Sequence, residues 1–191
     1  MNKKPVVFLD RDGTLNVEVG YIRNLEDLNL IEGAAEAIKK LNKAGVAAIL
    51  VTNQTGAARG YYAESHIHDL NARLVKLLEN GGAHLDAVYY CPHLEEGTVA
   101  PYNVACQCRK PEAGMVHQAY SEHPELDSSR SFVVGDKATD VELAQNCGAK
   151  GVLVTTGYGT AVQKGQYQHP VEPDFEAPSI VEAVDWILKQ V

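Results

Sequence analysis

Residues 6–14 read VVFLDRDGT, and the rest of the chain is organised around this stretch. Four apolar residues, three of them β-branched or aromatic, stop abruptly at an acidic turn that contains Gly13. A short apolar run of this kind is typical of a buried strand in a parallel sheet, which we expect over Pro5 to Leu9. The stretch therefore predicts an α/β protein whose first strand ends at Asp10.

The two carboxylates that follow this strand are the first sign of a functional site. Open α/β sheets bind their ligands outside the carboxyl ends of the strands, where Asp10 would lie. Residues i and i+2 of an extended chain point to the same side, so we expect the carboxylate of Asp12 to converge on that of Asp10. Two carboxylates at one point repel each other unless a cation or a shared proton relieves the repulsion. The pair therefore predicts a metal site.

The bulk composition limits the classes of protein to consider. The chain of 191 residues suits one domain with a sizeable core. Its formal net charge of −8 argues against a nucleic-acid or anionic-membrane surface, although a local cluster of cations can still bind a small anionic substrate. No apolar run approaches the ~20 residues that span a bilayer, and the one near the N-terminus is too short for a signal peptide. We therefore expect a cytoplasmic protein that binds neither nucleic acid nor membranes, with a monomer as the default.

Strand-like and helix-like segments alternate along the chain. The expected strands are residues 5–9, 46–51, 85–90, 131–134 and 151–155; the expected helices are 33–44, 64–80, 112–122 and 180–190, with another that ends near Cys147. Residues 157–178 show no periodicity, and we expect a long surface connection there. The alternation predicts a single doubly wound, mostly parallel Rossmann-like sheet, with residues 1–191 as one domain.

Polar turns follow three of the expected strands. Asp10 and Asp12 follow the first strand, Thr52 the second and Asp136 the fourth, while Lys110 precedes the helix that leads into the fourth. Parallel strands end at the same edge of a sheet, so these groups would surround one point. Carboxylate oxygens suit Mg²⁺, and Mg²⁺ with a lysine and a phosphate is a phosphoryl-transfer arrangement. One carboxylate can attack phosphorus, and a second can protonate the leaving alcohol and activate water.

Each of these groups, taken singly, has a plainer explanation. Thr52 could be a strand-end hydroxyl and Lys110 a solvated loop charge. Asp136 and Asp140 could cap a helix, where the helix dipole favours carboxylates. Their joint placement at one sheet edge is what favours catalysis.

The same residues resemble the four motifs of the haloacid dehalogenase superfamily, in order and at workable spacing. The matching segments are 10–14 (DRDGT), Thr52, Lys110 and 135–137 (GDK) with Asp140. The resemblance implies Asp10 as nucleophile and Asp12 as general acid and base. It also implies that Thr52 and Lys110 hold the phosphoryl oxygens.

The resemblance further implies a Mg²⁺ site made by Asp10, the backbone carbonyl of Asp12, and Asp136. Asp140 would support this site without binding the metal. The motif spacings leave no room for a large cap domain.

One loop carries three of the four cysteines. Cys91 and His93 precede a gap of twelve residues, which Cys106 and Cys108 close. Three thiolates and one imidazole suit a closed tetrahedral Zn²⁺ site with no open position for catalysis, so we expect structural zinc. Such zinc can contribute on the order of 10 kcal/mol to ordering the loop. The alternative is a loop with free thiols and an incidental histidine; Cys147 stands apart, and we expect a small buried apolar residue there.

A zinc-bearing loop directly before Arg-Lys-Pro resembles two groups within the superfamily. One is the D-glycero-D-manno-heptose 1,7-bisphosphate 7-phosphatases, and the other is the histidinol-phosphate phosphatases, which typically have a much shorter gap between the His and the second pair of cysteines. The gap between His93 and Cys106 therefore resembles that of the heptose enzymes. Residues 18–21 (EVGY) and 52–60 (TNQTGAARG) also resemble that family, although Thr55 stands where we expect Ser.

By this resemblance a set of polar residues contacts the substrate: Glu18, Tyr21, Asn53, Gln54, Thr55, Arg109 and Lys137. Arg109 is the best candidate for the distal phosphate at C1, because its planar fork can donate two hydrogen bonds to phosphate. The loops 15–30 and 91–108 would shape the specificity pocket.

The resemblance thus implies a Mg²⁺-dependent phosphatase with structural Zn²⁺. It would hydrolyse the C7 phosphate of heptose 1,7-bisphosphate through an aspartyl phosphate, supplying nucleotide-activated heptose for lipopolysaccharide. One alternative is a phosphatase for histidinol phosphate or another small sugar phosphate. Another is a zinc-stabilised interaction module with a vestigial site, against which the intact motif residues argue. A nucleotide-binding Rossmann domain is a third, but the first turn lacks a G-x-G-x-x-G.

Overall fold

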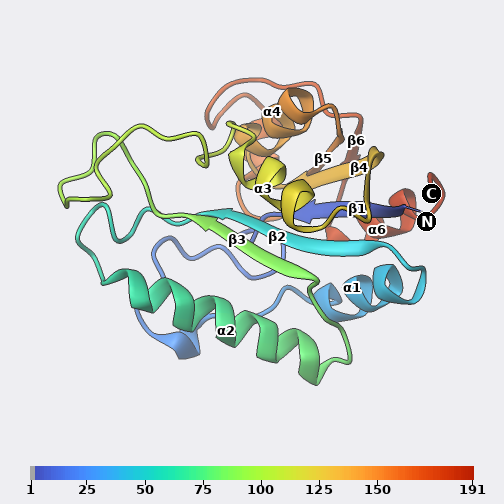
Figure 1. Ribbon diagram of the computed structural model, residues 1–191, viewed down its shortest axis with the longest axis horizontal. Helices are drawn as coiled ribbons and strands as arrows, with labels where there is room; N and C mark the ends of the chain where they lie inside the picture. Colours follow the sequence, from blue (N-terminus) through green and yellow to red (C-terminus); the bar gives the residue numbers. More distant parts are fainter. Residues whose placement is uncertain (1–2) are drawn as a thin grey trace.

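The computed structural model describes residues 3–191 and shows a six-stranded sheet with helices on both faces (Figure 1). All neighbouring strands are parallel, in the order β3-β2-β1-β4-β5-β6. The strands are β1 (Lys4–Leu9), β2 (Ala47–Asn53), β3 (Ala87–Cys91), β4 (Leu126–Gly135), β5 (Lys150–Val154) and β6 (Phe175–Ala177). The predicted doubly wound parallel sheet is confirmed.

The helices form one layer on each face of the sheet. Helices α1 (Ala34–Lys43), α2 (Glu64–Asn80) and α6 (Ile180–Ile187) cover one face, and α3 (Gly114–Glu122) and α4 (Ala138–Cys147) cover the other (Figure 1). A 3-10 helix, η1 (Leu25–Asp27), and a short helix, α5 (Gly159–Gln163), lie in the connections. The helices expected from periodicity are all present, with ends that shift by a few residues.

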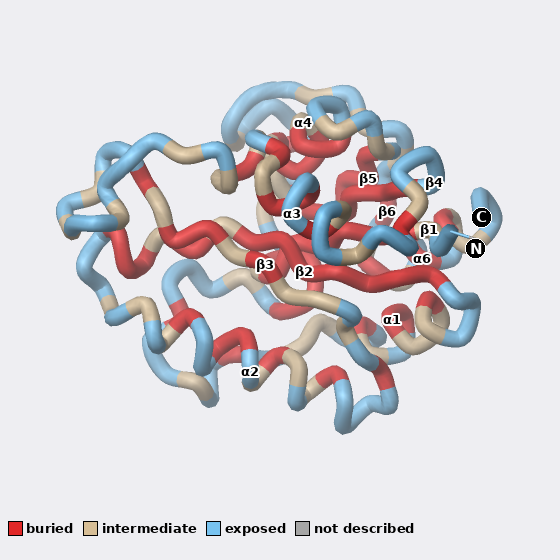
Figure 2. Tube along the Cα trace, in the orientation of Figure 1, coloured by how far each residue is buried: buried red, intermediate tan, exposed pale blue. Residues whose placement is uncertain are grey.

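Alternate residues of each central strand face the two helical layers. Val7 and Leu9 of β1 pack in the cluster with α1, α2 and α6, whereas Val6 and Phe8 pack in the cluster with α3 and α4. The central strands are buried along most of their length (Figure 2). Burial on both faces explains why β1 reads as an unbroken apolar run rather than as an alternating one.

The strand order places the carboxyl ends of β1 and β4 next to each other. The chain runs outward from β1 through β2 to β3 and then returns to β4 on the other side of β1. The amide of Asp10 donates to the carbonyl of Val134 at 2.9 Å, so the turns after β1 and β4 begin side by side. Ligands of open α/β sheets bind in the crevice at such a reversal.

Residues 157–178 are more ordered than their lack of periodicity predicted. They contain α5 and β6, and β6 adds a sixth strand in parallel to β5. Phe175 of β6 stacks on Trp186 of α6 with ring centroids 4.8 Å apart. A strand of three residues at a sheet edge is too short to show a period, so periodicity did not predict β6 within the expected surface connection.

The long connections all leave the sheet at its carboxyl edge. Residues 10–33 and 92–113 are the longest of them, and no inserted domain interrupts the alternation within residues 3–191. No helix in that range has the length and apolar character needed to cross a membrane.

Candidate active site

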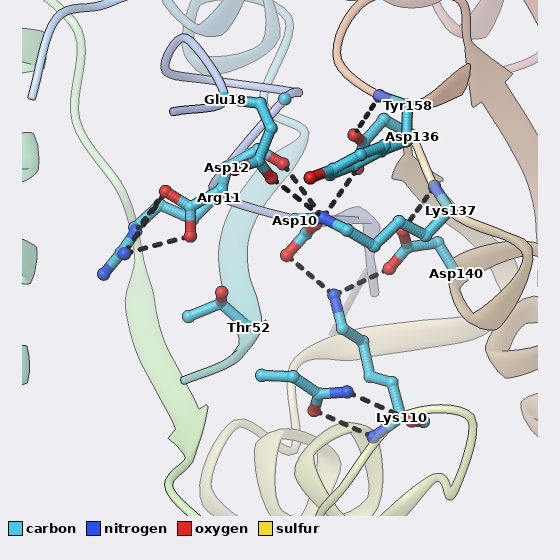
Figure 3. Close-up of polar contacts among 12 residues, drawn as sticks. Asp10, Arg11, Asp12, Glu18, Thr52, Lys110, Asp136, Lys137, Asp140 and Tyr158 are labelled. Atoms are coloured by element: carbon cyan, nitrogen blue, oxygen red, sulfur yellow. Dashed lines mark hydrogen bonds and ion pairs between the residues drawn. The ribbon is translucent and has the colours of Figure 1, made fainter. Parts of the chain in front are cut away.

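Lys110 lies between two buried carboxylates at the carboxyl edge of the sheet (Figure 3). Its Nζ is 2.8 Å from Asp10 Oδ1 and 2.6 Å from Asp140 Oδ1, and it donates to the carbonyl of Val51 at 2.9 Å. Burial by itself would lower the pKa of this lysine, but the two carboxylates raise it above its ordinary value. Lys110 is therefore a charged ammonium that compensates Asp10 and Asp140.

The carboxylate of Asp10 is ionised although it is buried. Burial tends to raise its pKa, but the positive charges of Lys110 and Lys137 outweigh that effect and hold the pKa at about 2. Asp10 also lines a cavity of about 280 Å³. An ionised oxygen that faces a cavity is available as a nucleophile.

The ammonium of Lys137 lies among the oxygens that the resemblance assigned to Mg²⁺. Its Nζ is 3.7 Å from Asp10 Oδ2, 3.5 Å from the carbonyl oxygen of Asp12 and 3.2 Å from Asp136 Oδ1 (Figure 3). Glu18 Oε2 is 3.3 Å from the same atom. Three hard oxygens that converge on one cation are a donor set that fits Mg²⁺.

Asp136 is fully buried beneath two close-packed turns. Burial raises the pKa of its carboxyl; Lys137 opposes that shift, and the value reaches about 7. Gly13 and Gly157 both have positive φ, and a Cβ on either would run into the Asp136 carboxylate. The amide of Tyr158 donates to Asp136 Oδ2 at 2.8 Å (Figure 3). The segment after β5 therefore closes over this carboxylate.

The carboxylates that converge on Asp10 are those of Asp136 and Asp140, whose oxygens lie within 4.8 Å of one another. The side chain of Asp12, which we expected at the same point, is not a member of this group. β1 ends at Leu9, and the amides of residues 14–16 bond back to the carbonyl of Arg11, so the chain is no longer extended at Asp12. The carboxylates of Asp10 and Asp12 still line the same cavity.

A buried network orients the carboxylate of Asp12. It accepts hydrogen bonds from Arg11 Nη2 at 3.0 Å, Asn16 Nδ2 at 3.0 Å and Gln54 Nε2 at 2.8 Å. Gln54 also accepts from Arg11 at 2.7 Å and donates to Thr52 Oγ1 at 2.9 Å. Gln54 therefore links Asp12 to Thr52, a positioning role beyond the substrate contact expected of it.

Arg11 is a member of this network that the sequence did not reveal. Its side chain is fully buried and donates to Asn71 Oδ1 of α2 at 3.0 Å. A charged residue between two aspartates in a turn carries no pattern that predicts burial. Its role in orienting Asp12 becomes visible only in the structure, where α2 and the segment after β2 pack against Arg11.

The cavity brings together all the predicted substrate contacts. It is lined by Asp10, Asp12, Glu18, Tyr21, Asn53, Gln54, Thr55, Arg109, Lys110 and Lys137. Thr52 lies beneath it, almost completely buried. Sequence reasoning did not assign seven further lining residues to the site: Gly20, Arg59, Tyr62, Thr139, Tyr158, Tyr167 and Gln168.

Several of these side chains are held by neighbours. The side chain of Asn53 exchanges two hydrogen bonds with the backbone of Lys110, at 3.0 and 3.1 Å. The hydroxyls of Tyr21 and Thr55 lie 3.1 Å apart, and Arg109 donates to the carbonyl of His93 at 3.4 Å. The cysteine loop, the loop after β1 and the segment after β2 are thus joined around the cavity.

The cysteine loop gathers four potential metal ligands. Sγ of Cys91, Cys106 and Cys108 and Nδ1 of His93 all lie within 4.8 Å of one another. Hydrogen bonding with Cys91 is the main cause that lowers the pKa of Cys108 to about 5, so the group carries a thiolate at neutral pH. Three sulfurs and one imidazole nitrogen at this spacing fit Zn²⁺. Cys147 lies apart on α4, partly buried.

Family models define the class of protein. Residues 7–77 match the model described as haloacid dehalogenase-like hydrolase, and residues 107–183 match a model described as HAD-hydrolase-like. The fold and the carboxylates at the sheet edge agree with this class of hydrolases.

Individual relatives identify the family within this class of hydrolases. The chain is 53% identical to a D-glycero-D-manno-heptose-1,7-bisphosphate 7-phosphatase of Thermosynechococcus vestitus, over 96% of this chain and 95% of the relative. It is 37% identical to a D-glycero-beta-D-manno-heptose-1,7-bisphosphate 7-phosphatase of Escherichia coli, over 98% and 90%. The D,D-heptose 1,7-bisphosphate phosphatase of B. bronchiseptica, solved with magnesium and phosphate, superposes with a TM-score of 0.84 at 26% identity and covers 98% of this chain and 99% of its own. The chain therefore belongs to the heptose-1,7-bisphosphate 7-phosphatase family of haloacid dehalogenase-like hydrolases, and these relatives do not favour the histidinol-phosphate alternative.

Proposed function

We propose that this protein removes the C7 phosphate of D-glycero-D-manno-heptose 1,7-bisphosphate with the help of Mg²⁺. The observation that carries the proposal is the ionised Asp10 carboxylate, which faces the cavity between the ammonium groups of Lys110 and Lys137. The names of the relatives supply the substrate. The product would feed the synthesis of nucleotide-activated heptose for lipopolysaccharide.

The proposed reaction has two steps that use two carboxylates. Asp10 Oδ attacks phosphorus while the bond from phosphorus to the C7 oxygen breaks, and Asp12 gives its proton to that oxygen. Asp12 then takes a proton from water, whose oxygen attacks the aspartyl phosphate; phosphate leaves and Asp10 is restored. The hydrogen bonds from Arg11, Asn16 and Gln54 would keep Asp12 aimed at the leaving oxygen.

The remaining site residues would bind charge. Asp10, the carbonyl of Asp12 and Asp136 would hold Mg²⁺, which when bound neutralises phosphoryl oxygens and aligns the phosphate. Thr52 and Lys110 would hold the phosphoryl oxygens. Lys137, whose ammonium lies beside Asp10 and Asp136, would contact the substrate.

The distal part of the substrate would contact the loops. Arg109 would bind the C1 phosphate, and Asn53 would keep Arg109 and Lys110 in place through the backbone of Lys110. Glu18, Tyr21, Gln54 and Thr55 complete the proposed contacts; they line the same cavity.

We further propose that Cys91, His93, Cys106 and Cys108 hold structural Zn²⁺. A reducing cytoplasm would keep these thiols available as ligands, and we expect the protein to work there as a monomer. Light scattering of the purified protein checks the monomer.

Asp10→Asn tests the proposed nucleophile. Asparagine keeps the shape of the side chain but lacks the attacking oxygen, so we expect phosphate release to fall by at least about a thousandfold while the thermal unfolding curve remains that of a folded protein. Measurable turnover near the wild-type rate would refute the role of Asp10.

A substrate comparison tests the specificity. Phosphate release is measured with both C1 anomers of heptose 1,7-bisphosphate, with histidinol phosphate and with other sugar phosphates. We expect one heptose bisphosphate anomer to have the highest kcat/KM, and its identity separates a route to ADP-heptose from one to GDP-heptose. A higher kcat/KM for histidinol phosphate would overturn the proposal.

A further inference from the structure

We propose that Tyr167 and Gln168 contact the sugar of the substrate and help to determine which phosphorylated sugars are hydrolysed. The inference rests on the phosphatase function proposed above. Both side chains line the same cavity as Asp10 and Lys137, although they lie in the aperiodic segment between β5 and β6. They thus supply a wall of the pocket in a chain that has no large cap within residues 3–191.

Hydrogen bonds fix this segment to the catalytic turns. Thr156 Oγ1 donates to the carbonyl of Gly13 at 2.6 Å, and the amide of Tyr158 donates to Asp136 at 2.8 Å. Farther along, Gln168 Oε1 accepts from the amide of Ala138 at the start of α4, at 2.8 Å. A wall tied to the reacting groups at both ends is preorganised for recognition.

The backbone at Gln168 supports a functional role. Its φ is 55°, and within residues 3–191 it is the single non-glycine residue with positive φ. Such a conformation is unfavourable for a residue with a side chain and persists where the surroundings determine it, commonly at ligand sites. Because Oε1 is taken by Ala138, the Gln168 amide nitrogen is the group that can donate to a ligand hydroxyl.

Aromatic packing joins this wall to the reacting groups. The rings of Tyr158 and Tyr167 are stacked with centroids 4.3 Å apart, and Lys137 Nζ lies 5.4 Å from the Tyr158 centroid. Tyr158 thus contacts both Lys137 and Tyr167 and joins Tyr167 to the reacting groups.

The chemistry of this wall suits a sugar rather than a second phosphate. Elsewhere the cavity is lined by the cations Arg59 and Arg109, which match a phosphate. Tyr167 and Gln168 carry no charge; an aromatic face packs on the C–H face of a sugar, and an amide bonds its hydroxyls.

The test uses two variants that preserve the packing of the segment. Tyr167→Leu keeps an apolar side chain against the cluster of Ala138, Val141, Leu153 and Val162. Gln168→Glu keeps the acceptor for Ala138 but brings a negative charge toward an anionic substrate. The matched control is His169→Ala, because the adjacent His169 pairs with Glu142 of α4 and does not line the cavity.

The substrates are heptose 1,7-bisphosphate and acetyl phosphate, which carries its phosphate on a two-carbon group. We expect both variants to raise KM for the bisphosphate about tenfold with little change in kcat, because the lost contact is remote from the reacting phosphorus. For Tyr167→Leu, the kcat/KM for acetyl phosphate and the inhibition constant of inorganic phosphate should stay at the wild-type values. For Gln168→Glu, whose charge repels every anion, both should change clearly less than the KM for the bisphosphate. His169→Ala should match the wild type throughout.

Two failures are distinguishable. An unchanged KM for the bisphosphate, or an equal loss with acetyl phosphate, overturns the role of Tyr167 and Gln168. A wild-type enzyme that hydrolyses acetyl phosphate but not the bisphosphate overturns the proposed function instead. The variants are then compared on the sugar phosphate that the enzyme prefers. Unchanged KM values for that substrate would again refute the role of Tyr167 and Gln168.

Discussion

At the scale of single residues, the site depends on buried charges that compensate one another. Lys110 touches Asp10 and Asp140 and is almost fully buried with them. A buried charge that loses its partner costs far more than an exposed one, because no water replaces the lost contact. The Lys110 ammonium is therefore expected to serve stability as well as phosphate binding.

Lys110→Met tests the contribution of the Lys110 ammonium to stability. The variant removes the cation that touches both buried carboxylates and leaves only the more distant Lys137 beside Asp10, so we expect the free energy of unfolding to fall by about 3–5 kcal/mol in urea denaturation. The control is Lys40→Met, which breaks an exposed pair with Asp185 and should change stability by less than about 1 kcal/mol. Equal losses for both variants would contradict the compensating role of Lys110.

At the scale of elements, the cysteine loop connects the proposed Zn²⁺ site to the active site. Cys108 directly precedes Arg109 and Lys110, and Arg109 bonds to the backbone of His93 inside the same loop. A loop of this length has few apolar residues to order it, so the proposed Zn²⁺ would supply the missing stability. An ordered loop would then fix the positions of Arg109 and Lys110, the two proposed phosphate ligands.

Metal removal tests this connection. We expect purified protein to contain about one Zn²⁺ per chain by the closed-site argument, and Cys106→Ser to lose it together with most of the kcat/KM. Elemental analysis and phosphate release measure the two effects. Cys147→Ser is the matched control, since this cysteine lies apart from the cluster and should keep both metal and activity. Wild-type protein that is fully active without bound metal would refute the proposed structural Zn²⁺.

At the scale of the whole molecule, the sheet is expected to unfold as one unit. Two core clusters share the central strands, and both helical layers pack on them. The single tryptophan, Trp186 of α6, stacks on Phe175 and meets Phe132 of β4 edge-on. Its fluorescence therefore reports on the sheet away from the cysteine loop.

Ligand binding tests this cooperativity. A ligand that binds only the native state stabilises it by about 2.7 kcal/mol at a hundred times its Kd. We therefore expect inorganic phosphate with Mg²⁺ to raise the unfolding midpoint seen by Trp186 fluorescence and by far-ultraviolet circular dichroism equally. Potassium chloride at matched ionic strength is the control. Midpoints that separate would show two independent units in place of one domain.

The sequence by itself determined the fold class and the order of the motifs. Strands buried on both faces must be apolar, and a polar turn must follow each one that ends at a site, so VVFLDRDGT and the later strand ends were readable without coordinates. The residue types that would hold Mg²⁺, Zn²⁺ and phosphate are likewise visible in sequence. Periodicity also located each helix of eight or more residues to within a few residues.

Tertiary structure decided which side chains meet. The side chains of Asp136 and Asp140 lie beside Asp10 because the strand order sets β4 next to β1, and Lys110 pairs with Asp10 and Asp140. The chain leaves the extended conformation after β1, so the carboxylate of Asp12 bonds to Arg11 and Gln54 instead. Tyr167 and Gln168 reach the cavity from a segment with no period, since hydrogen bonds to the catalytic turns, rather than a repeating apolar pattern, hold that segment in place.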